Sequence, residues 1–544
     1  MNKPLLKRIA IDLTPLLPGG DNGGAKPLAI ELIRHLARVA PHCEFILLTN
    51  EKSHEELKPL ETGAPNVQRL CTTQPQNNTP LSLRMGLRAR RLLLRFLPDS
   101  ALRKLAQLYS ALFPAAPPST SLLRQVAAEL LFCPFTGVLF FDPSVPVVSL
   151  VHDLQYLAYP EFFEPEVRHE RDRHFRQVCR LAGRLICVSA FTRAAVLEHV
   201  DIPPERVVAI PSAPQHRLPA ASRVPAALPL TSGRYLLYPA NFWRHKNHEL
   251  LLTAFGLYRA AHPASDLKLV LTGAPGPRRD QLIDAARRMR LAESVVFPGY
   301  LPDDEFAALL AGCAAMIFPS LFEGFGMPVL EAMAAGVPVL CANRTSLPEV
   351  AGDAALLFDP RRPVEIVDAI TRLEADPALR RTLIEKGKQH LRSLPGPADM
   401  AARYLQVFQD LVSHPAETAP AVYGVFADGW TSARVTVVFG AAPQPRRLTV
   451  KLKAPEWIPA EAVSIQVLPG AELHRIPRGS EQVFTRELPG GAPGVIEFCC
   501  SPTFQPSKCG GGEDHRSLGC LLESATIFDP TGNALQLPTH ADAA

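Results

Sequence analysis

The chain has 544 residues, which at roughly 150 residues per domain predicts about three to four domains with ample hydrophobic core. Hydrophobic residues make up 47% of the sequence, which excludes a disordered chain, and the 54 prolines are about twice the usual share. The formal net charge is only +4, so composition gives no support to nucleic-acid binding.

We expect a cytoplasmic protein without a targeting or membrane-spanning segment. The opening "MNKPLLKRIAIDLTPLLPGG" has a short apolar run and no small-residue cleavage site. The longest apolar tract, 130–151, is interrupted by Asp142 and by prolines, which excludes a membrane-spanning helix. The 11 cysteines, an odd number without a signal peptide, indicate reduced thiols.

Residues 1–212 are expected to form a first α/β domain. The run "RIAIDL" reads as a buried strand, "PLLPGGDNGGAK" as a loop, and "PLAIELIRHLARVA" as an amphipathic helix followed by the strand "EFILLTN". The same rhythm returns at "VPVVSLVHD" and at "RLICVSA" with its helix "FTRAAVLEHV". Strands that alternate with helices predict a parallel sheet.

A second α/β domain is expected at 234–413, after a proline-rich linker at 213–233. Its strands include "RYLLYPA", "LKLVLTG", "AAMIFPS" and "VPVLCAN", and a closing helix spans 398–412. From residue 422 to 540, alternation replaces helical spacing, with short strands between Pro/Gly turns, which predicts an all-β sandwich. The fold class is therefore two doubly wound α/β domains plus a C-terminal sandwich.

A basic insertion occupies 82–131 of the first domain. Its cations stand among leucines and are Arg84, Arg88, Arg90, Arg91, Arg95, Arg103 and Lys104. A basic amphipathic helix predicts contact between 82–104 and a membrane surface, such as the inner face of the plasma membrane. The alternative interpretation is a solvated helix that covers the first domain.

The strongest functional signal is "FPSLFEGFGMPVLEAMAAGVPV". A strand ends at Ser320, and a glycine-flanked turn after Glu323 leads into a helix near Pro328. The start of a helix offers backbone N–H groups and the positive end of its dipole, which suits a phosphate. Glu331 lies in the first turns of this helix, and carboxylates beside a phosphate cradle can accept hydrogen bonds from sugar hydroxyls. The pattern predicts a nucleotide-sugar site rather than a surface loop with a capping glutamate.

This segment, with "YLLYPANFWRHKNHELLLTAF", "VVFPGYLPDDEFAALLAGC" and "RTSLPEVAGDAALLFDP", resembles retaining glycosyltransferases of family 4. The resemblance covers about residues 1–413 and implies the GT-B architecture, in which two Rossmann-like domains face a cleft. Glu323 and Glu331 match the family's E-x₇-E signature. By that resemblance Glu323 contacts the transferred sugar and Glu331 the ribose.

The resemblance also assigns the groups that bind the donor phosphates. Backbone amides at Phe325, Gly326 and Met327 would hold the sugar and diphosphate, next to Gly324. Lys246 matches the family lysine on the diphosphate, where its charge would stabilise the leaving group in place of a metal ion. Where many relatives carry an arginine this chain has Ala240 and Asn241, and either Arg244 or His245 could substitute.

Further positions in each of the two domains match the family pattern. In the first domain these are Gly23 and Gly24 in the N-terminal glycine loop, and His152 after a buried strand, where ligands bind in such sheets. In the second domain Tyr300 or Leu301 occupies the loop that contacts the base in relatives. The alternatives are a tight turn for the glycines and a packed histidine for His152. Ser189 and Thr192 are expected to cap a helix rather than to bind ligand.

The C-terminal cysteines, Cys499, Cys500, Cys509 and Cys520, with His515, do not have the paired spacing of a zinc knuckle, so we expect no metal. The stretch "TFQPSKCGGGEDHRSLGCLLESATIFD" looks like the last strands of a sandwich appended to some polysaccharide glycosyltransferases. Asp514 and Arg516 could pair there. Carbohydrate binding and simple packing are both open for this domain.

The resemblance implies a retaining, metal-independent hexosyltransferase of cell-surface polysaccharide or lipopolysaccharide biosynthesis. It would take no cofactor and would bind a nucleotide sugar and a glycan or lipid-linked acceptor. "PANFWRHKNH" looks most like mannosyltransferases that use GDP-mannose, and a UDP-hexose or deoxyhexose donor is the alternative. The rival functions are a GT-B nucleotide-sugar epimerase and a non-catalytic glycan-binding or scaffold protein.

Overall fold

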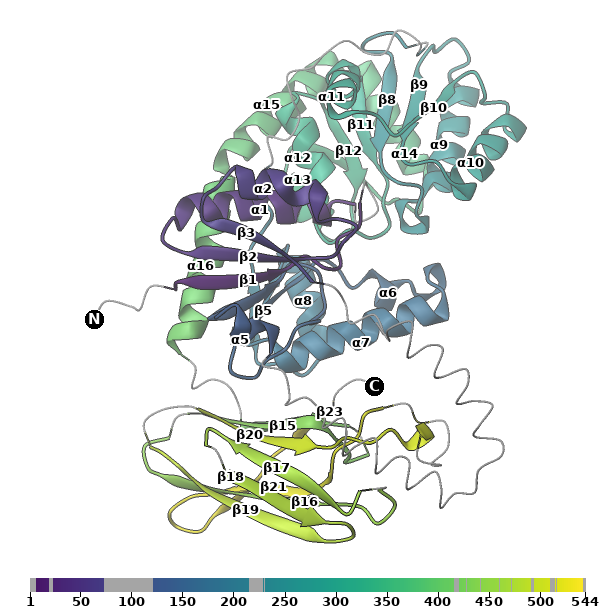
Figure 1. Cartoon of the computed structure of the whole chain (residues 1–544). Helices are drawn as coiled ribbons and strands as arrows, with labels where there is room; N and C mark the ends of the chain where they lie inside the picture. The colour runs from purple at the N-terminus through teal and green to yellow at the C-terminus, as the bar shows by residue number, and fades with distance from the viewer. Residues whose placement is uncertain are drawn as a thin grey trace, which may run out of the picture.

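Three bodies follow one another along the chain in the computed structural model (Figure 1). The structure describes residues 6–18, 23–72, 121–214, 228, 230–414, 420–426, 428–440, 442–458, 460–470, 472–490, 494–508, 514 and 516–541. The basic stretch 82–104, predicted to contact a membrane surface, lies outside these residues. Within the described ranges, every helix is too short or too polar to cross a membrane.

The first body is a seven-stranded parallel sheet in the order β3-β2-β1-β4-β5-β6-β7. Its strands are β1 (Arg8–Asp12), β2 (Glu44–Thr49), β3 (Val67–Cys71), β4 (Leu130–Cys133), β5 (Val147–Val151), β6 (Arg184–Cys187) and β7 (Val207–Ala209). Its helices are α1 (Ala25–Val39), η1 (Glu55–Leu57), α2 (Lys58–Thr62), α5 (Leu122–Gln125), α6 (Gln155–Ala158), η2 (Pro160–Phe162), α7 (Pro165–Leu181), α8 (Ala190–His199) and η3 (Pro204–Arg206). Central strands such as β5 are buried along their whole length, because helices cover both faces.

The second body is a six-stranded parallel sheet in the order β10-β9-β8-β11-β12-β13. Its strands are β8 (Tyr235–Pro239), β9 (Lys268–Thr272), β10 (Val295–Gly299), β11 (Ala315–Phe318), β12 (Val339–Ala342) and β13 (Ala355–Phe358). Its helices are η4 (Arg244–Lys246), α9 (His248–Ala261), α10 (Pro277–Arg288), α11 (Asp303–Gly312), α12 (Met327–Ala334), α13 (Leu347–Ala351), α14 (Pro363–Ala375) and α15 (Pro377–Ser393). In both sheets the strand order reverses beside the first strand, where ligands bind in such folds.

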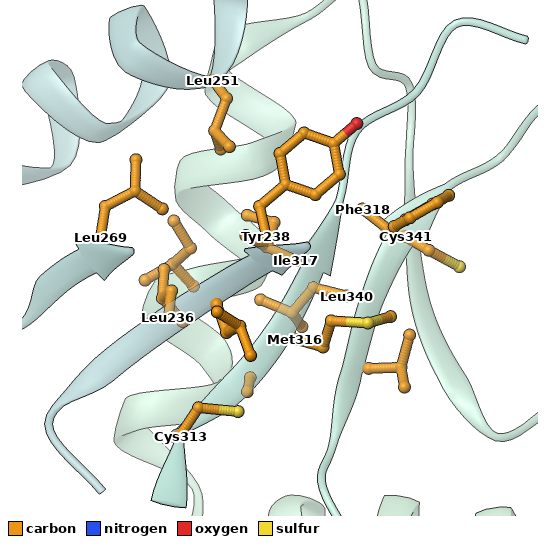
Figure 2. Packing of buried hydrophobic residues seen from close by; sticks show 14 of the residues in the cluster. Leu236, Tyr238, Leu251, Leu269, Cys313, Met316, Ile317, Phe318, Leu340 and Cys341 are labelled. Atoms are coloured by element: carbon orange, nitrogen blue, oxygen red, sulfur yellow. The ribbon is translucent and has the colours of Figure 1, made fainter. Parts of the chain in front are cut away.

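The core of the second body packs on the central strands β8, β11 and β12. Figure 2 shows Leu236 and Tyr238 from β8 beside Ile317 and Leu340 from the neighbouring strands. The Tyr238 hydroxyl donates a hydrogen bond to the backbone carbonyl of Lys246 at 2.8 Å. The core therefore extends directly to the segment that carries the predicted catalytic lysine.

The helix α16 (Pro397–Ser413) packs against the first body, although the sequence analysis grouped it with the second. Its buried face, which includes Tyr404 and Phe408, belongs to the core around α1 and β4. The rings of both residues contact Phe132 of β4, and the green helix lies beside the purple first domain in Figure 1. Periodicity identified the apolar face of this helix, but only the tertiary structure shows which body covers it.

The C-terminal body is a β-sandwich of two mainly antiparallel sheets, as the alternation predicted. The sheets have the orders β18-β17-β20-β15-β14-β23 and β19-β16-β21-β22. The strands are β14 (Ala421–Val425), β15 (Thr431–Phe439), β16 (Arg446–Lys453), β17 (Ala462–Leu468), β18 (Glu472–Pro477), β19 (Glu481–Leu488), β20 (Gly494–Ser501), β21 (Leu521–Phe528), β22 (Ala534–Gln536) and β23 (Thr539–Ala541), with η6 (Pro506–Lys508). Alternate residues such as Leu448, Val450 and Leu452 of β16 fill its core.

The sandwich is docked onto the first body through a buried ion pair. Arg124 of α5 donates to both carboxylate oxygens of Glu497 on β20, at 2.9 and 3.1 Å. Arg124 also pairs with Asp142 at 2.7 Å, and Arg434 approaches Glu497 at 3.3 Å. The side chain of Glu497 is only 4% exposed. Beside this network the rings of Phe141 and Tyr423 lie 5.0 Å apart in a small apolar cluster.

Candidate active site

Lys246 and Glu323 form an ion pair at the carboxyl ends of two adjacent strands. Lys246 ends η4, which follows β8, and Glu323 follows β11. The Lys246 Nζ lies 2.6 Å from Glu323 Oε1, and each side chain is 12% exposed. The ammonium also lies 5.5 Å from the centre of the Phe318 ring. Two of the three residues predicted to be catalytic are therefore in direct contact.

The backbone around Lys246 is held on both sides. Besides its bond to the Lys246 carbonyl, the Tyr238 hydroxyl lies 3.0 Å from Ser320 Oγ at the end of β11. Asn247 adopts the left-handed conformation, at φ 61°, and its amide donates to the carbonyls of Pro319 and Pro360 at 3.1 and 2.8 Å. Asparagine tolerates this conformation better than most residues, and the tether fixes the direction of Lys246.

Two residues that sequence reasoning did not single out hold the Glu323 loop. The Glu323 N–H donates to Thr345 Oγ1 at 3.1 Å, and Ser346 Oγ donates to the carbonyls of Glu323 and Phe325 at 2.9 and 2.8 Å. Ser346 is fully buried, and Thr345 has a positive φ of 56°. Their position in the sequence could have indicated this role. They follow β12, whose carboxyl end lies at the sheet edge that carries Lys246 and Glu323.

The helix α12 begins at Met327, as the glycine turn predicted. Its N-cap, Gly326, has φ 106°, and an added Cβ would meet Leu347 at 2.5 Å, so the position requires glycine. The first N–H groups of an α-helix have no acceptor within the helix. In this first turn Pro328 has no N–H, and the Val329 N–H donates to the Gly326 carbonyl at 3.0 Å. Glu331 is buried on the same helix, four residues beyond Met327. The turn before α12 and the start of this helix therefore resemble an anion-binding site, and the Lys246–Glu323 pair lies beside it.

The two parallel-sheet bodies contact each other at Gly324. Its carbonyl accepts hydrogen bonds from Ser189 Oγ at 2.6 Å and from Thr192 Oγ1 at 3.1 Å. Ser189 also caps α8, as predicted, by accepting from the Thr192 N–H. A second contact joins the Glu349 carboxylate to the backbone N–H groups of Ala190 and Phe191, at 2.8 and 3.1 Å. Both contacts converge on the first turn of α8.

His152 lies at this interface and is held by its own domain. Its Nε2 is 2.7 Å from the carbonyl oxygen of Pro134, and its ring lies near Phe135. Burial lowers the pKa of His152, although the Pro134 carbonyl and Asp153 oppose the shift. The His152 carbonyl would be 1.8 Å from a Cβ on Gly324. The structure thus brings His152 next to the predicted donor loop.

The glycine loop of the first domain faces the segment before Lys246. Gly23 has φ 53° and an added Cβ there would lie 3.0 Å from the Trp243 ring, while Gly24 is the N-cap of α1.

Of the two candidates for the missing arginine, His245 is buried, and this burial, together with Lys246, lowers its pKa to about 3. His245 is therefore uncharged at neutral pH, and Arg244, which is exposed beside Trp243, stays the cationic candidate.

The two candidates for base contact differ in their surroundings. Tyr300 follows β10 and is 67% exposed, whereas Leu301 packs against the core of the second body. Their role in binding the base stays a prediction, and Tyr300 is the one whose ring is available to a ligand.

The C-terminal cysteines do not gather into a ligand set in the described part of the chain. Cys499 and Cys500 are successive residues of β20, so their side chains point to opposite faces of the strand. Cys500 lies near Cys520 inside the sandwich, where the hydrogen bond with the Cys500 thiol, together with burial, raises the pKa of Cys520. Cys509 and His515 lie outside the described residues, and among those described no three His, Cys, Asp or Glu side chains group as a metal site.

Two parallel-sheet domains that meet at their carboxyl ends define the GT-B class of glycosyltransferase folds. Solved structures with this fold superpose on most of the chain. HepE of Anabaena, crystallised with UDP and glucose, is 16% identical with a TM-score of 0.51 and covers 74% of this chain and 100% of its own. TarM is 10% identical with a TM-score of 0.51 over 75% of this chain and 100% of its own.

Family models identify both α/β domains. Residues 22–213 match "Glycosyltransferase Family 4" and residues 225–390 match "Glycosyl transferases group 1". Each of these two regions is therefore similar to the glycosyltransferase family whose model it matches.

The curated relatives each match less than half of this chain. The chain is 32% identical over 237 residues to O-antigen chain mannosyltransferase B of Escherichia coli, covering 41% of this chain and 59% of that protein. It is 30% identical over 252 residues to the serotype-specific mannosyltransferase WbdA of Escherichia coli, covering 44% and 29%. A glycogen synthase of Mycobacterium tuberculosis is 32% identical over 177 residues, covering 32% and 42%. The aligned segments thus span less than two thirds of the length of each of these relatives.

Proposed function

We propose that this chain transfers a mannosyl group from GDP-mannose to a glycan or lipid-linked acceptor of cell-surface polysaccharide, with retention of anomeric configuration. The observation that carries the proposal is the Lys246–Glu323 pair at the head of α12. It combines a cation, a carboxylate and a helix N-terminus at one sheet edge, which suits a sugar joined to a diphosphate. The mannosyltransferases among the curated relatives support mannose as the sugar.

Lys246 would stabilise the negative charge that develops on the departing nucleoside diphosphate. Its ammonium is desolvated and already oriented, so it needs little reorganisation during the reaction. The amides of Phe325, Gly326 and Met327 would bind phosphate oxygens and the sugar. The departing phosphate oxygen would take the proton of the acceptor hydroxyl on the same face of the sugar, which gives retention without a covalent enzyme intermediate.

Glu323 would orient the sugar by accepting hydrogen bonds from its hydroxyls, while Glu331 would bind the ribose. In the described structure one Glu323 oxygen is engaged by Lys246, which leaves the carboxylate further acceptor positions. Binding of a donor would therefore require Lys246 to share its protons between Glu323 and the diphosphate. His152 of the first domain would contact the sugar or the leaving group from the opposite side.

The proposed reaction takes place in the cytoplasm, and the stretch 82–104 would bring the enzyme to the inner membrane face. Charge neutralisation by Lys246 removes the need for a metal ion in this scheme. The glycan acceptor and the nucleotide sugar are the proposed partners, and GDP-mannose is preferred over UDP-hexoses and deoxyhexose donors.

The experiment that tests the proposal is a transfer assay on the purified full chain with GDP-mannose, UDP-glucose and dTDP-rhamnose, with and without EDTA. α-Mannose oligosaccharides serve as acceptors, and NMR of the product gives the configuration of the new linkage. We expect α-linked product from GDP-mannose alone, at an undiminished rate in EDTA. Isomerised donor without transfer would indicate an epimerase instead, and donor binding without any turnover would indicate a scaffold.

A further inference from the structure

The sandwich carries a pair of tryptophans at the end where β14 turns into β15. Trp430 closes this turn, and Trp457 lies between β16 and β17. The ring centres are 5.3 Å apart at an angle of 63°, an edge-to-face contact that holds both rings. Trp457 is nevertheless 42% exposed. A large apolar ring is thus fixed in place with part of its surface open to solvent.

A compact charged group stands at the same turn. Arg516 donates to both oxygens of Asp428 at 2.6 and 3.1 Å and to Asp514 at 2.7 Å. The guanidinium also lies 4.8 Å from the centre of the Phe426 ring. All three charged side chains remain partly exposed. The group has one cation and two carboxylates, so it disfavours an anionic ligand.

The hairpin geometry places the aromatic pair and the charged group on one face. The Phe426 N–H donates to the Trp430 carbonyl at 2.7 Å, and the Gly429 N–H donates to the Phe426 carbonyl at 2.9 Å. Gly429 has φ 83°, which this tight turn requires. Phe426 and Trp430 are therefore opposite each other across the hairpin, and such pairs project from the same face. Arg516, which packs on Phe426, lies on the face that carries the tryptophans.

We propose that this surface is a binding site for a neutral hexose glycan. The sandwich aromatic cluster consists of Phe426, Asp428, Trp430, Trp457, Asp514 and Arg516. The exposed indole can pack against the C–H face of a pyranose ring, which is apolar, while carboxylate oxygens accept hydrogen bonds from its hydroxyls. Arg516 is fixed by two carboxylates, so the polar groups are preorganised before the sugar arrives.

The placement of the sandwich gives this site a role in glycan transfer. This part of the inference rests on the proposed function. The Arg124–Glu497 pair and the contact of Phe141 with Tyr423 join the sandwich to the first domain. The first domain is the acceptor side in the GT-B resemblance. A glycan bound to the cluster would therefore be held by the same unit that receives the acceptor end.

Binding is measured without nucleotide sugar, so the result does not depend on catalysis. The chain contains three tryptophans, and the substitution Trp243→Phe leaves only the pair at 430 and 457 as emitters. This full-length variant is titrated with soluble α-mannan and with dextran while tryptophan emission is recorded. The second variant adds Trp457→Ala, and affinity electrophoresis in gels that contain each glycan compares the two. The matched control adds Leu473→Ala, which removes an exposed apolar side chain from β18 of the same sandwich.

We expect a saturable change of emission with at least one of the two glycans. Trp457→Ala should weaken binding by tenfold or more, and Leu473→Ala should leave it unchanged. No retardation and no emission change with either glycan would overturn the site, as would unaltered binding by the Trp457→Ala variant. If the wild-type chain binds glycan but transfers no mannose in the assay above, the proposed function would be contradicted. The glycan-binding site would still be supported.

Discussion

The Ser189 hydroxyl in the first domain donates a hydrogen bond to the Gly324 carbonyl in the second, at 2.6 Å. The same serine caps α8, so one side chain both starts a helix and joins the two α/β domains. Gly324 immediately follows Glu323, one member of the ion pair with Lys246. The contact between the domains is therefore one residue away from Glu323, which is proposed to bind the donor sugar together with Lys246.

The substitution Gly324→Ala should force the two domains apart. An added Cβ would lie 1.8 Å from the His152 carbonyl oxygen, a distance that backbone movement alone can relieve. We expect transfer activity to fall by roughly 10²-fold or more, because misplacing reacting groups by about 1 Å has such effects. The measurements are kcat and the radius of gyration in solution, which should rise. Gly276→Ala is the control, since nothing lies within 4 Å of an added Cβ there. Wild-type turnover by the Gly324→Ala variant would show that this contact is not part of the active arrangement.

Removal of the Lys246 ammonium should affect catalysis more than folding. In the Lys246→Ala variant we expect kcat to fall by roughly 10²–10³-fold, the usual effect of losing one preorganised charge or donor. The substitution leaves the Glu323 carboxylate partly buried without this partner, so we also expect a small decrease in Tm. Steady-state kinetics with GDP-mannose and a thermal melt provide the measurements.

The control for Lys246 is Lys386→Ala. Lys386 forms an ion pair of similar length, 2.7 Å, with Asp353, but both side chains are well exposed. It should change neither kcat nor Tm appreciably. Turnover within about twofold of wild type in Lys246→Ala would remove Lys246 from the proposed mechanism.

His248 should make the protein less stable in mild acid. Its ring is fully buried between Tyr238 and Phe242, and neither ring nitrogen makes a hydrogen bond of good geometry within the described chain. Burial, with Lys246 and Arg278 nearby, lowers the pKa of His248 to about 3. The unfolded chain, with a pKa near about 6.5, therefore binds a proton that the folded chain rejects. The resulting stability is present above about pH 6.5 and is lost as the pH falls toward about 3.

Between about pH 7 and 5 this single group should lower the free energy of unfolding by roughly 2 kcal/mol. The variant His248→Phe keeps the aromatic packing and should flatten this part of the profile, as measured by the urea midpoint at each pH. His199→Gln, at an exposed position, is the control and should leave the slope unchanged. A His248→Phe profile as steep as that of the wild type would refute the assignment.

Breaking the buried bridge to the sandwich should uncouple the two bodies. Glu497→Ala leaves Arg124 and Arg434 without the carboxylate that both approach, and we expect a loss of about 2–4 kcal/mol. In calorimetry the sandwich should then melt as a separate transition. Glu523→Ala is the control, because Glu523 pairs with Lys451 on an exposed face of the same sandwich. A single unchanged transition in Glu497→Ala would mean that the apolar contacts alone hold the sandwich.

Local patterns in the sequence predicted the strands and helices around the site well. The apolar run before Ser320 and the glycines after Glu323 specify a strand, a tight turn and the start of α12 at Met327. Each of these depends on a few neighbouring residues, so sequence spacing carries the information. The capping role of Ser189 was predictable for the same reason, because its hydroxyl oxygen accepts from the N–H of a residue three positions later.

Contacts between distant segments could not be predicted in the same way. Arg124 and Glu497 are separated by 373 residues, and nothing in either local pattern identifies the other. Similarly, the amphipathic pattern of α16 shows that Tyr404 and Phe408 are buried but not that Phe132 covers them. The holding roles of Thr345 and Ser346 depend on the order of strands in the sheet, which brings β12 beside β11. The specific packing of such pairs is set by tertiary structure rather than by residue spacing.

The docking of α16 and the sandwich on the first domain has a consequence for successive rounds of reaction. The second domain is joined to the rest by the segments that precede β8 and α16. We expect it to move as one part against a larger one. Release of the spent nucleotide would displace the donor-binding part, while the sandwich would stay with the acceptor side. A polymer anchored on Trp457 would keep its place during that exchange. This is the mechanical condition for processive elongation, in which one enzyme adds many sugars before it releases the chain.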